Sequence, residues 1–401
     1  MTRILRFGMV GGGPGAFIGA VHQRAAEYDG RARLVAGAFS SDAARSQAHG
    51  RALGLDAARV YDDYRTMAER EAARTDDRID LVVIVTPNHL HHEIATAFLE
   101  CDIHVVCDKP LTTTLSDAES LCRLAAQRDR LLAVSYVYTG YPMVRQARAL
   151  VADGAVGTLR RISVQYTQGW LAQAVERTGQ KGAVWRTDPA LAGAGALGDI
   201  GVHAFHLMGY VSGLAPQRLF ADVTTHVDGR RVDDDASVLL QYDDGVRGLL
   251  VCTQVAGGVE NDVRLRVSGD AGTLEWSHAH PEELVLHQAS GGQRVYTRGG
   301  PDPVPAALRA MRLPPGHPEG FHDAFASMYA DTIAVIEKHG AAAGDRNASR
   351  VAVAAIARQV DLPDAADGAA GVHFIETALR SSREQCWVDA RWQAPMARAR
   401  S

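Results

Sequence analysis

"MVGGGPGAFIGAVH", residues 9–22, decides the fold of the first part of the chain. The stretch follows an apolar run directly and leads into a helical pattern. Glycines at such a turn allow a tight bend, and they let backbone N–H groups approach a pyrophosphate at the N-terminus of the next helix. Gly11, Gly13 and Gly19 align with the pattern G-x-G-x-x-G, in a loop longer than the usual spacing. A glycine cluster alone would also fit a flexible loop, but this position favours dinucleotide binding.

Short β-type runs alternate with helical stretches on either side of this loop. The strand candidates are 5–10, 33–39, 81–85, 104–107 and 131–135, and helical segments between them include 42–53, 89–100 and 117–129. Apolar runs without strict alternation, separated by helices, indicate a parallel sheet buried on both faces. We therefore predict an α/β fold with a doubly wound Rossmann domain over residues 1–135. Its ligands are expected outside the carboxyl ends of the strands.

Residues 136–401 show a different pattern, which predicts an α+β domain with an open, mainly antiparallel sheet of at least five strands. The strand candidates are 160–168, 219–227, 235–241, 246–255, 262–268 and 272–276, joined by tight turns such as "YDDGV". Helices are expected near 143–153, 321–338 and 365–381. The stretch 288–320, rich in Gly and Pro, is expected to be a surface excursion.

The composition of the whole chain narrows the class of protein. Its 401 residues suggest two domains, and 46% hydrophobic with 22% charged residues is typical of soluble globular proteins. A net charge of −5 does not indicate a basic surface that would bind nucleic acid or an anionic membrane. No apolar run is long enough to span a bilayer. Five cysteines without a C-x-x-C pair fit reduced thiols, so we expect a cytoplasmic protein without a secretory signal.

A second informative stretch is "GALGDIGVHAFHL", residues 195–207. At helical spacing Asp199, His203, His206 and Tyr210 share one stripe, while the rest of the helix is apolar. Such a helix is buried, so its polar stripe must face a cavity, a ligand or buried polar partners. An isolated His would usually be a core residue. Two His, one Asp and one Tyr on one stripe favour a site.

Two strand ends carry polar residues that could lie opposite this stripe. In "VVCDKPL", Lys109 lies between Asp108 and Pro110, where it could place positive charge beside a nicotinamide; otherwise it is a surface lysine paired with Asp108. In "IVTPNHLHH", the His residues could suggest a metal. A helix start with one imidazole that reaches the cofactor is the simpler interpretation, and we predict no metal site.

The acidic residue that usually binds the ribose, about twenty residues after the glycine loop, is missing. Ser40 and Ser41 stand there instead, Asp42 fits a helix start, and Arg45 could pair with a 2′-phosphate. NAD is favoured, with NADP left open. The residues predicted to bind the cofactor are Gly11, Gly13, Ile18, Gly19, Ser40, Ser41, Arg45, Thr86, Pro87, Asn88, His91, Asp108 and Lys109.

Four stretches in order carry a resemblance to a known family: "GGGPGAFIG", "TPNHLHHEIA", "CDKPL" and "GDIGVHAFHL". Through them the chain resembles the glucose–fructose oxidoreductase/inositol dehydrogenase/MocA family over nearly its full length. One position departs, because Asp108 replaces the Glu of the family's E-K-P. The resemblance implies a Rossmann domain, a C-terminal α/β domain whose open sheet often forms the interface of a homodimer or homotetramer, and Lys109, Asp199 and His203 as catalytic residues.

The chemistry of alcohol oxidation fits these residue types. Hydride leaves carbon for the nicotinamide while the hydroxyl proton goes to a base. His203 suits that base, Lys109 would hold the hydroxyl and stabilise alkoxide charge, and Asp199 would orient substrate hydroxyls and favour an imidazolium. His206 is either a supporting contact or packing.

Further stretches, among them "QYTQGW" and "GHPEGFHDAFA", are most similar to family members that oxidise unphosphorylated sugars, such as levoglucosan dehydrogenase and pyranoside 3-dehydrogenases. This likeness implies hydride transfer from a ring secondary hydroxyl, at C3, of a neutral pyranose or pyranoside. The expected substrate-binding residues are Tyr136, Tyr138, Trp170, Trp185, Arg186, Asp199 and His203. The alternatives are an inositol 2-dehydrogenase, a metal-dependent hydrolase or lyase, and a non-catalytic dinucleotide-binding sensor.

Overall fold

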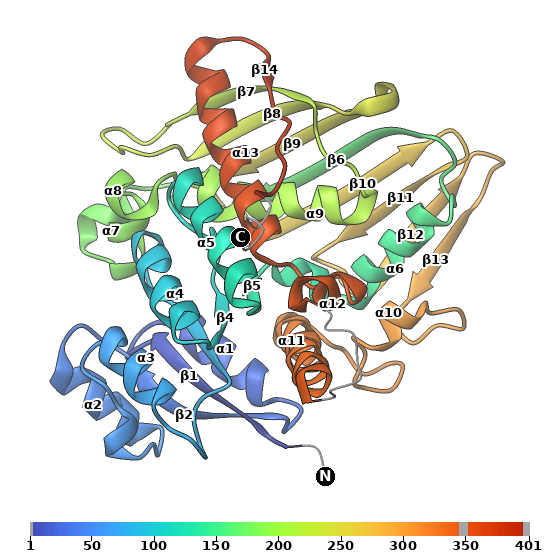
Figure 1. Cartoon of the computed structure of the whole chain (residues 1–401). Helices are drawn as coiled ribbons and strands as arrows, with labels where there is room; N and C mark the ends of the chain where they lie inside the picture. Colours follow the sequence, from blue (N-terminus) through green and yellow to red (C-terminus); the bar gives the residue numbers. More distant parts are fainter. Residues whose placement is uncertain (1–2, 345–351, 396–401) are drawn as a thin grey trace.

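The computed structural model describes residues 3–344 and 352–395, and two sheets organise them (Figure 1). The first is a five-stranded parallel sheet in the order β2-β1-β3-β4-β5. Its strands are β1 (Leu5–Gly11), β2 (Ala32–Ala38), β3 (Leu81–Val85), β4 (His104–Cys107) and β5 (Leu132–Val134). Every residue of β3, β4 and β5 is buried, which confirms the doubly wound sheet predicted from continuous apolar runs.

The helices between these strands also follow the predicted order. They are α1 (Phe17–Glu27), α2 (Ala43–Ala52), α3 (Tyr64–Ala72), α4 (His91–Glu100) and α5 (Leu115–Arg128). Asp42 accepts the N–H of Arg45 and so begins α2, as an N-cap aspartate does.

The second sheet has nine strands in the described residues, in the order β13-β12-β11-β10-β6-β9-β8-β7-β14. Only β6 and β9 pair in parallel, so the sheet is mainly antiparallel as predicted. Its strands are β6 (Leu159–Thr167), β7 (Arg218–Thr224), β8 (Asp235–Gln241), β9 (Arg247–Thr253), β10 (Asp262–Gly269), β11 (Gly272–Ser277), β12 (Glu283–Gln288), β13 (Gln293–Thr297) and β14 (Val388–Asp389).

Helices cover one face of this sheet, and several join the two halves. They are α6 (Pro142–Ala152), α7 (Lys181–Arg186), α8 (Pro189–Ala192), α9 (Val202–Ser212), α10 (Pro305–Leu308), α11 (Phe321–Gly344), α12 (Val353–Gln359) and α13 (Ala365–Glu384). Helix α11 packs on α1 and α13 packs on α5, so the end of the chain returns to the first sheet (Figure 1). Within the described ranges, no helix is long and apolar enough to cross a membrane.

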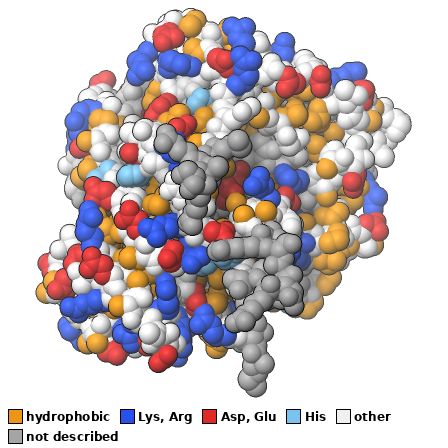
Figure 2. Space-filling model, in the orientation of Figure 1, with side chains coloured by type: hydrophobic (Ala, Val, Ile, Leu, Met, Phe, Trp, Pro, Cys, Tyr) orange, Lys and Arg blue, Asp and Glu red, His pale blue; other side chains and the backbone are white. Residues whose placement is uncertain are grey.

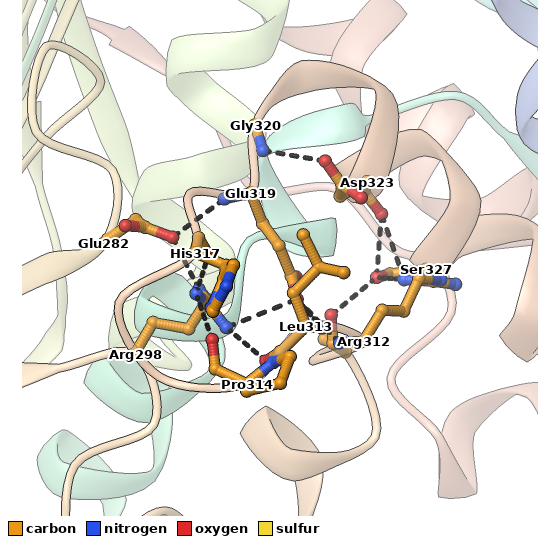
Figure 3. A network of polar contacts seen from close by, with 11 residues as sticks. Glu282, Arg298, Arg312, Leu313, Pro314, His317, Glu319, Gly320, Asp323 and Ser327 are labelled. Atoms are coloured by element: carbon orange, nitrogen blue, oxygen red, sulfur yellow. Dashed lines mark hydrogen bonds and ion pairs between the residues drawn. The ribbon is translucent and has the colours of Figure 1, made fainter.

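The stretch 288–320 is largely exposed, as predicted, but it is more than a loop. It contains the end of β12, all of β13 and α10, and the buried guanidinium of Arg298. Arg298 donates to Glu282 Oε1 at 2.5 Å, to the Leu313 carbonyl at 2.9 Å and to Glu319 at 3.3 Å (Figure 3). One buried cation therefore holds residues 313–319 against the sheet, and Gly and Pro content gives no sign of such an anchor.

Side chains of different kinds gather on different parts of the surface. Figure 2 shows Lys, Arg, Asp and Glu mixed over the lower left, where Figure 1 places α2 and α3. Hydrophobic side chains gather on the right, where β11 to β13 and α10 lie. Val295 of β13 is 45% exposed and Leu308 of α10 is 52% exposed.

Candidate active site

The stripe of polar residues predicted on one helix is divided between two kinds of helical turn. Residues Leu197–Gly201 form a π-helical turn, and the α-helix α9 begins only at Val202. A π turn contains more residues than an α turn, so Asp199 and His203 do not keep the α-helical register assumed from spacing. Short π segments occur frequently at functional sites.

Asp199 lies where the two halves of the chain meet. The Nζ atom of Lys109, which follows β4, lies 2.8 Å from Asp199 Oδ1 and also donates to the backbone carbonyl of Asp199. Gln254, which follows β9, donates its Nε2–H to Asp199 Oδ2 at 2.8 Å. Arg186 Nε lies 3.5 Å from the same oxygen. The structure thus brings Lys109 and Asp199 together, as the resemblance implied.

The charges around Asp199 keep it ionised. Burial alone would raise the pKa of Asp199, but Lys109 and Arg186 outweigh burial and hold that pKa well below its usual value. Asp199 is therefore a carboxylate at any pH at which the protein is studied. Lys109 and Arg186 both face this one carboxylate.

His203 lies in an aromatic pocket next to this group. Its ring centroid is 5.4 Å from that of Tyr138 and 6.3 Å from that of Tyr166, and its Nδ1 has no hydrogen-bond partner in the part of the chain described. Burial lowers the pKa of His203 well below its usual value, and the charge of Lys109 lowers it further. The imidazole is neutral at pH 7, which suits a base. Asp199 raises the pKa of His203, as expected, but burial and the charge of Lys109 outweigh this contribution.

Four predicted substrate residues lie around this group. Tyr138 donates its hydroxyl to Tyr166 at 2.8 Å, and Trp170 donates Nε1–H to Gln168 at 3.0 Å. The guanidinium of Arg186 lies 4.3 Å from the centre of the Trp185 ring, close enough for a cation–π contact. Arg186 therefore links the aromatic Trp185 to Asp199.

Tyr136 and His206 form a stacked pair beside His203, whose ring centroid lies 5.8 Å from that of Tyr136. Their rings stack at 4.0 Å, and a Cβ at Gly371 of α13 would lie 2.4 Å from the Tyr136 hydroxyl. The hydroxyl therefore faces α13, and the pair fills the space between α9 and α13. Burial lowers the pKa of His206 to about 3, with a smaller contribution from Arg148. The role of His206, a supporting contact or packing, stays a prediction: its ring stacks on Tyr136, and its Nε2 lies 3.9 Å from Asp367 Oδ1.

Sequence reasoning missed Gln254 and Tyr166. Gln254 follows a strand of apolar residues and is 2% exposed. A single amide after such a strand is a weak signal, although a buried Gln requires partners. Tyr166 is part of an alternating strand pattern, and that pattern does not indicate that its hydroxyl lies in the site.

The glycine loop fits a dinucleotide. A Cβ at Gly13 would lie 2.5 Å from the carbonyl oxygen of Phe39, and one at Gly19 would lie 2.5 Å from Gly12 Cα, so β1, β2 and α1 meet too closely for side chains. Helix α1 begins after Ala16 with no side-chain cap and no acidic residue in its first turn. Its first N–H groups are therefore available to a pyrophosphate.

The strand ends contribute one unsatisfied group and three that hold the backbone. Thr86 Oγ1 is buried without a partner among the described residues. In contrast, Asn88 donates to the Ala192 carbonyl at 3.0 Å, and the His91 ring nitrogens lie 3.0 Å from the Pro110 carbonyl and 2.9 Å from the Thr86 carbonyl. Asp108 accepts the N–H of Lys109 at 2.9 Å. His91 thus fastens the two strand-end loops to each other and does not reach toward a ligand.

The remaining predicted cofactor residues lie at the same edge of the sheet. Pro87 follows Thr86, Ile18 is half-buried at the start of α1, and Ser40, Ser41 and Arg45 surround the start of α2. Ser41 and Arg45 are exposed. In the described ranges, no group of three or more His, Cys, Asp or Glu side chains could hold a metal ion.

Known proteins match both halves of the chain. Residues 5–136 match the oxidoreductase family with an NAD-binding Rossmann fold, and residues 144–275 match the GFO/IDH/MocA C-terminal domain. The uncharacterized oxidoreductase YfiI of Bacillus subtilis (strain 168) is 32% identical over 97% of this chain and 98% of its own length. The chain belongs to the Gfo/Idh/MocA family of oxidoreductases.

One further relative and one solved structure have names that refer to a sugar or a cyclitol. The levoglucosan dehydrogenase of Pseudarthrobacter phenanthrenivorans is 27% identical over 67% of this chain and 70% of its own. The crystal structure of an inositol dehydrogenase homolog from Azotobacter vinelandii, complexed with NAD+, is 35% identical, covers 97% of this chain and 98% of its own, and has a TM-score of 0.90. The chain is therefore an NAD(P)-dependent enzyme of a sugar and polyol oxidoreductase family.

Proposed function

We propose that the chain oxidises a ring secondary hydroxyl of a neutral pyranose or pyranoside, such as levoglucosan or a glucoside, at C3. One observation carries the preference for a neutral substrate. Lys109 and Arg186, the cations that the described residues bring to the site, both bind the carboxylate of Asp199. A phosphate or carboxylate on the substrate would need cations of its own, whereas a sugar needs hydrogen bonds and an aromatic face, which Trp185 and Trp170 offer.

Lys109, Asp199 and His203 divide the chemistry in this proposal. NAD, when bound, supplies the hydride acceptor. Neutral His203 takes the proton of the reacting hydroxyl, since its pKa is too low for it to be charged beforehand. Lys109 donates a hydrogen bond to the same oxygen and stabilises the negative charge that develops on it. Asp199 holds Lys109 in place and accepts from a neighbouring substrate hydroxyl.

The cofactor site in this proposal uses the predicted residues that remain accessible. The N–H groups after Ala16 hold the pyrophosphate, Thr86 Oγ1 binds the cofactor, and Ser40 and Ser41 bind the ribose. NAD is preferred because the sequence around Ser40 carries a single exposed cation, Arg45, and not a cluster of basic residues. Binding of NADP in preference to NAD would assign Arg45 to the 2′-phosphate.

A cyclitol is the second candidate substrate. A crystal structure 34% identical to this chain, from Azotobacter vinelandii, is an inositol dehydrogenase homolog complexed with NADH and myo-inositol. An inositol presents the same ring of neutral hydroxyls, so the arrangement of cations around Asp199 fits it equally.

We also propose a homodimer or homotetramer that works in the cytoplasm and assembles through the outer face of the nine-stranded sheet. Leu239 of β8 is 43% exposed and Val295 of β13 is 45% exposed, and both lie on strands of this sheet. The hydrophobic area over β11 to β13 in Figure 2 supports the same surface. Buried Cys107 and Cys252 carry free thiols, as in a reducing compartment.

A panel of substrates tests the proposed activity. Purified protein is mixed with NAD or NADP and with levoglucosan, methyl glucosides, inositols or sugar phosphates, and absorbance of the reduced cofactor is followed. We expect reduction with a neutral pyranose and none with its 3-deoxy analogue, because the analogue lacks the hydroxyl that is oxidised at C3. Preferred turnover of an inositol would select the second candidate, and preferred turnover of a sugar phosphate would refute both.

A further inference from the structure

The turn that carries Asp199 depends on a residue outside the site. Leu197–Gly201 has no side-chain cap from the residue that precedes it. The first N–H groups of a helical segment have no partners within that segment, so a buried segment needs an acceptor from elsewhere. Asp233, in the loop before β8, provides it.

Asp233 binds three consecutive N–H groups. One carboxylate oxygen accepts from Gly195 at 2.7 Å, the other accepts from Leu197 at 2.7 Å, and the backbone carbonyl accepts from Ala196 at 2.9 Å. The approach is so close that a Cβ at Gly195 would lie 1.8 Å from the Asp233 carbonyl oxygen. The chain that enters the π turn is therefore fixed to Asp233 at three points.

The next residue, Asp234, supports the other partner of Asp199. Its backbone carbonyl accepts the N–H of Gln254 at 2.9 Å, and Gln254 in turn binds Asp199 Oδ2. The Asp234 carboxylate points away from these groups, since it accepts from His226 N at 2.8 Å and from Arg230 at 3.1 Å. Asp199 is thus connected to residues 233–234 by two routes, one through its own backbone and one through Gln254.

We propose that Asp233 is a positioning residue that holds Asp199 where it meets Lys109. Asp233 is 7% exposed, and both of its carboxylate oxygens are occupied by N–H groups, so it acts through the turn and not on a substrate. The expected effect on kcat rests on the proposed function. The contact between Lys109 and Asp199 is independent of the proposed function, and it can be observed without turnover.

The lysines of the sequence are Lys109, Lys181 and Lys338, so reductive methylation with ¹³C-formaldehyde gives few signals in a ¹H–¹³C spectrum. In Asp233→Asn the amide nitrogen faces one of the two N–H groups, which replaces a hydrogen bond by a repulsive contact. We expect the Lys109 signal to move toward its position in Asp199→Ala, while the signals of Lys181 and Lys338 stay in place.

Asp234→Asn is the matched control. It also removes an oxygen acceptor from a buried carboxylate, one residue away, and it leaves the carbonyl that binds Gln254 unchanged. The Lys109 signal should keep its wild-type position in this variant even if its Tm falls. With a sugar that the enzyme oxidises, kcat of Asp233→Asn should fall roughly 10- to 100-fold, the cost of a misplaced reacting group, while NADH affinity is kept. A merely structural role would lower Tm and leave kcat per folded molecule unchanged.

An unmoved Lys109 signal in folded Asp233→Asn, or an equal movement in Asp234→Asn, overturns the proposal. Asp233→Glu, which keeps the charge but lengthens the side chain, is the second variant and should move the same signal. Loss of folding in both Asp233 variants, with Asp234→Asn still folded, would show that Asp233 supports the domain rather than this turn, and would also overturn it. If no sugar or cyclitol is oxidised, the proposed function fails and the spectroscopic result still decides the role of Asp233.

Discussion

Two buried groups of charged residues, one around Arg298 and one around Asp199, contain the same residue types but differ in what they do. Arg298 is 2% exposed at its side chain, and most of its hydrogen bonds go to carbonyls and carboxylates between residues 282 and 319. The partners of Asp199 come from residues 109, 186 and 254, which lie on separate elements of both halves. Because its partners lie mainly in one segment, Arg298 fixes that segment to the sheet. The partners of Asp199 come from separate elements, so their side chains converge on one site.

This comparison predicts that changes around Asp199 reduce activity and changes around Arg298 reduce stability. The largest expected effect is on catalysis. His203→Ala and Lys109→Ala should each lower kcat roughly 10²- to 10⁴-fold, the usual contribution of a positioned acid or base. NADH affinity, measured by fluorescence titration, should be largely kept in His203→Ala.

His206→Ala is the control, because the contacts of His206 within the described residues are with Tyr136, Tyr210 and Asp367. Its kcat should stay within a few-fold of the wild type. A dead His206→Ala beside a near-normal His203→Ala would reverse the assignment of the two histidines.

Arg298→Leu should separate stability from activity. Removal of one partner from a buried ion pair leaves Glu319 and Glu282 without their cation, and the free energy of unfolding should fall by about 3–5 kcal/mol. Urea denaturation measures this loss, and kcat per folded molecule should be unchanged. If activity fell before stability did, the two groups of charges would not be independent.

Gln254→Leu should have a smaller effect on activity. It removes one hydrogen bond from Asp199, which keeps Lys109 and Arg186. We expect kcat/KM to fall about tenfold, or about 1.4 kcal/mol in barrier height. Gln168→Leu, which cuts the hydrogen bond to Trp170 instead, is a comparison: an equal or greater loss there would place the main polar contact of the site away from Asp199.

The last prediction concerns acid stability. The pKa of His206 is about 3 in the folded chain, against about 6.5 in an unfolded one, so the unfolded chain binds the extra proton as the pH falls below 6.5. Stability should therefore decrease with falling pH in that window, and His206 accounts for about 2 kcal/mol of the loss at pH 5. His206→Phe should lose less stability than the wild type between pH 7.5 and pH 5, measured by urea denaturation. Equal losses would contradict the buried, neutral state of His206.

The sequence predicts the parts of the fold that depend on local pattern. The apolar runs of β3 and β4 and the glycine loop before α1 were placed within a few residues, because each has a pattern that only a buried parallel sheet or a tight turn explains. Strand β13 was missed because it is exposed along most of its length and does not alternate. Division of the chain at residues 135 and 136 stays a prediction, since α11 and α13 from the second part pack on the first.

In the candidate site, too, the sequence predicts what local pattern determines and misses what depends on tertiary contacts. Lys109, Asp199 and His203 stood out because charged and titratable residues are unusual in apolar surroundings. Spacing could not show that Tyr136 turns toward α13, or that His91 and Asn88 bind backbone carbonyls. Whether a polar side chain faces a ligand or its own backbone depends on tertiary contacts, which a one-dimensional pattern does not contain.

The π turn at Leu197–Gly201 bears on how chains of this kind can change by mutation. A π turn is an α-helix that accommodates extra chain within one turn. Loss of one in-frame codon there would leave an ordinary α-helical turn and rotate Asp199 by about 100° relative to α9, and it would also displace the N–H groups of Gly195 and Leu197 that Asp233 binds. The length of this turn therefore sets both the direction of Asp199 and its attachment to Asp233.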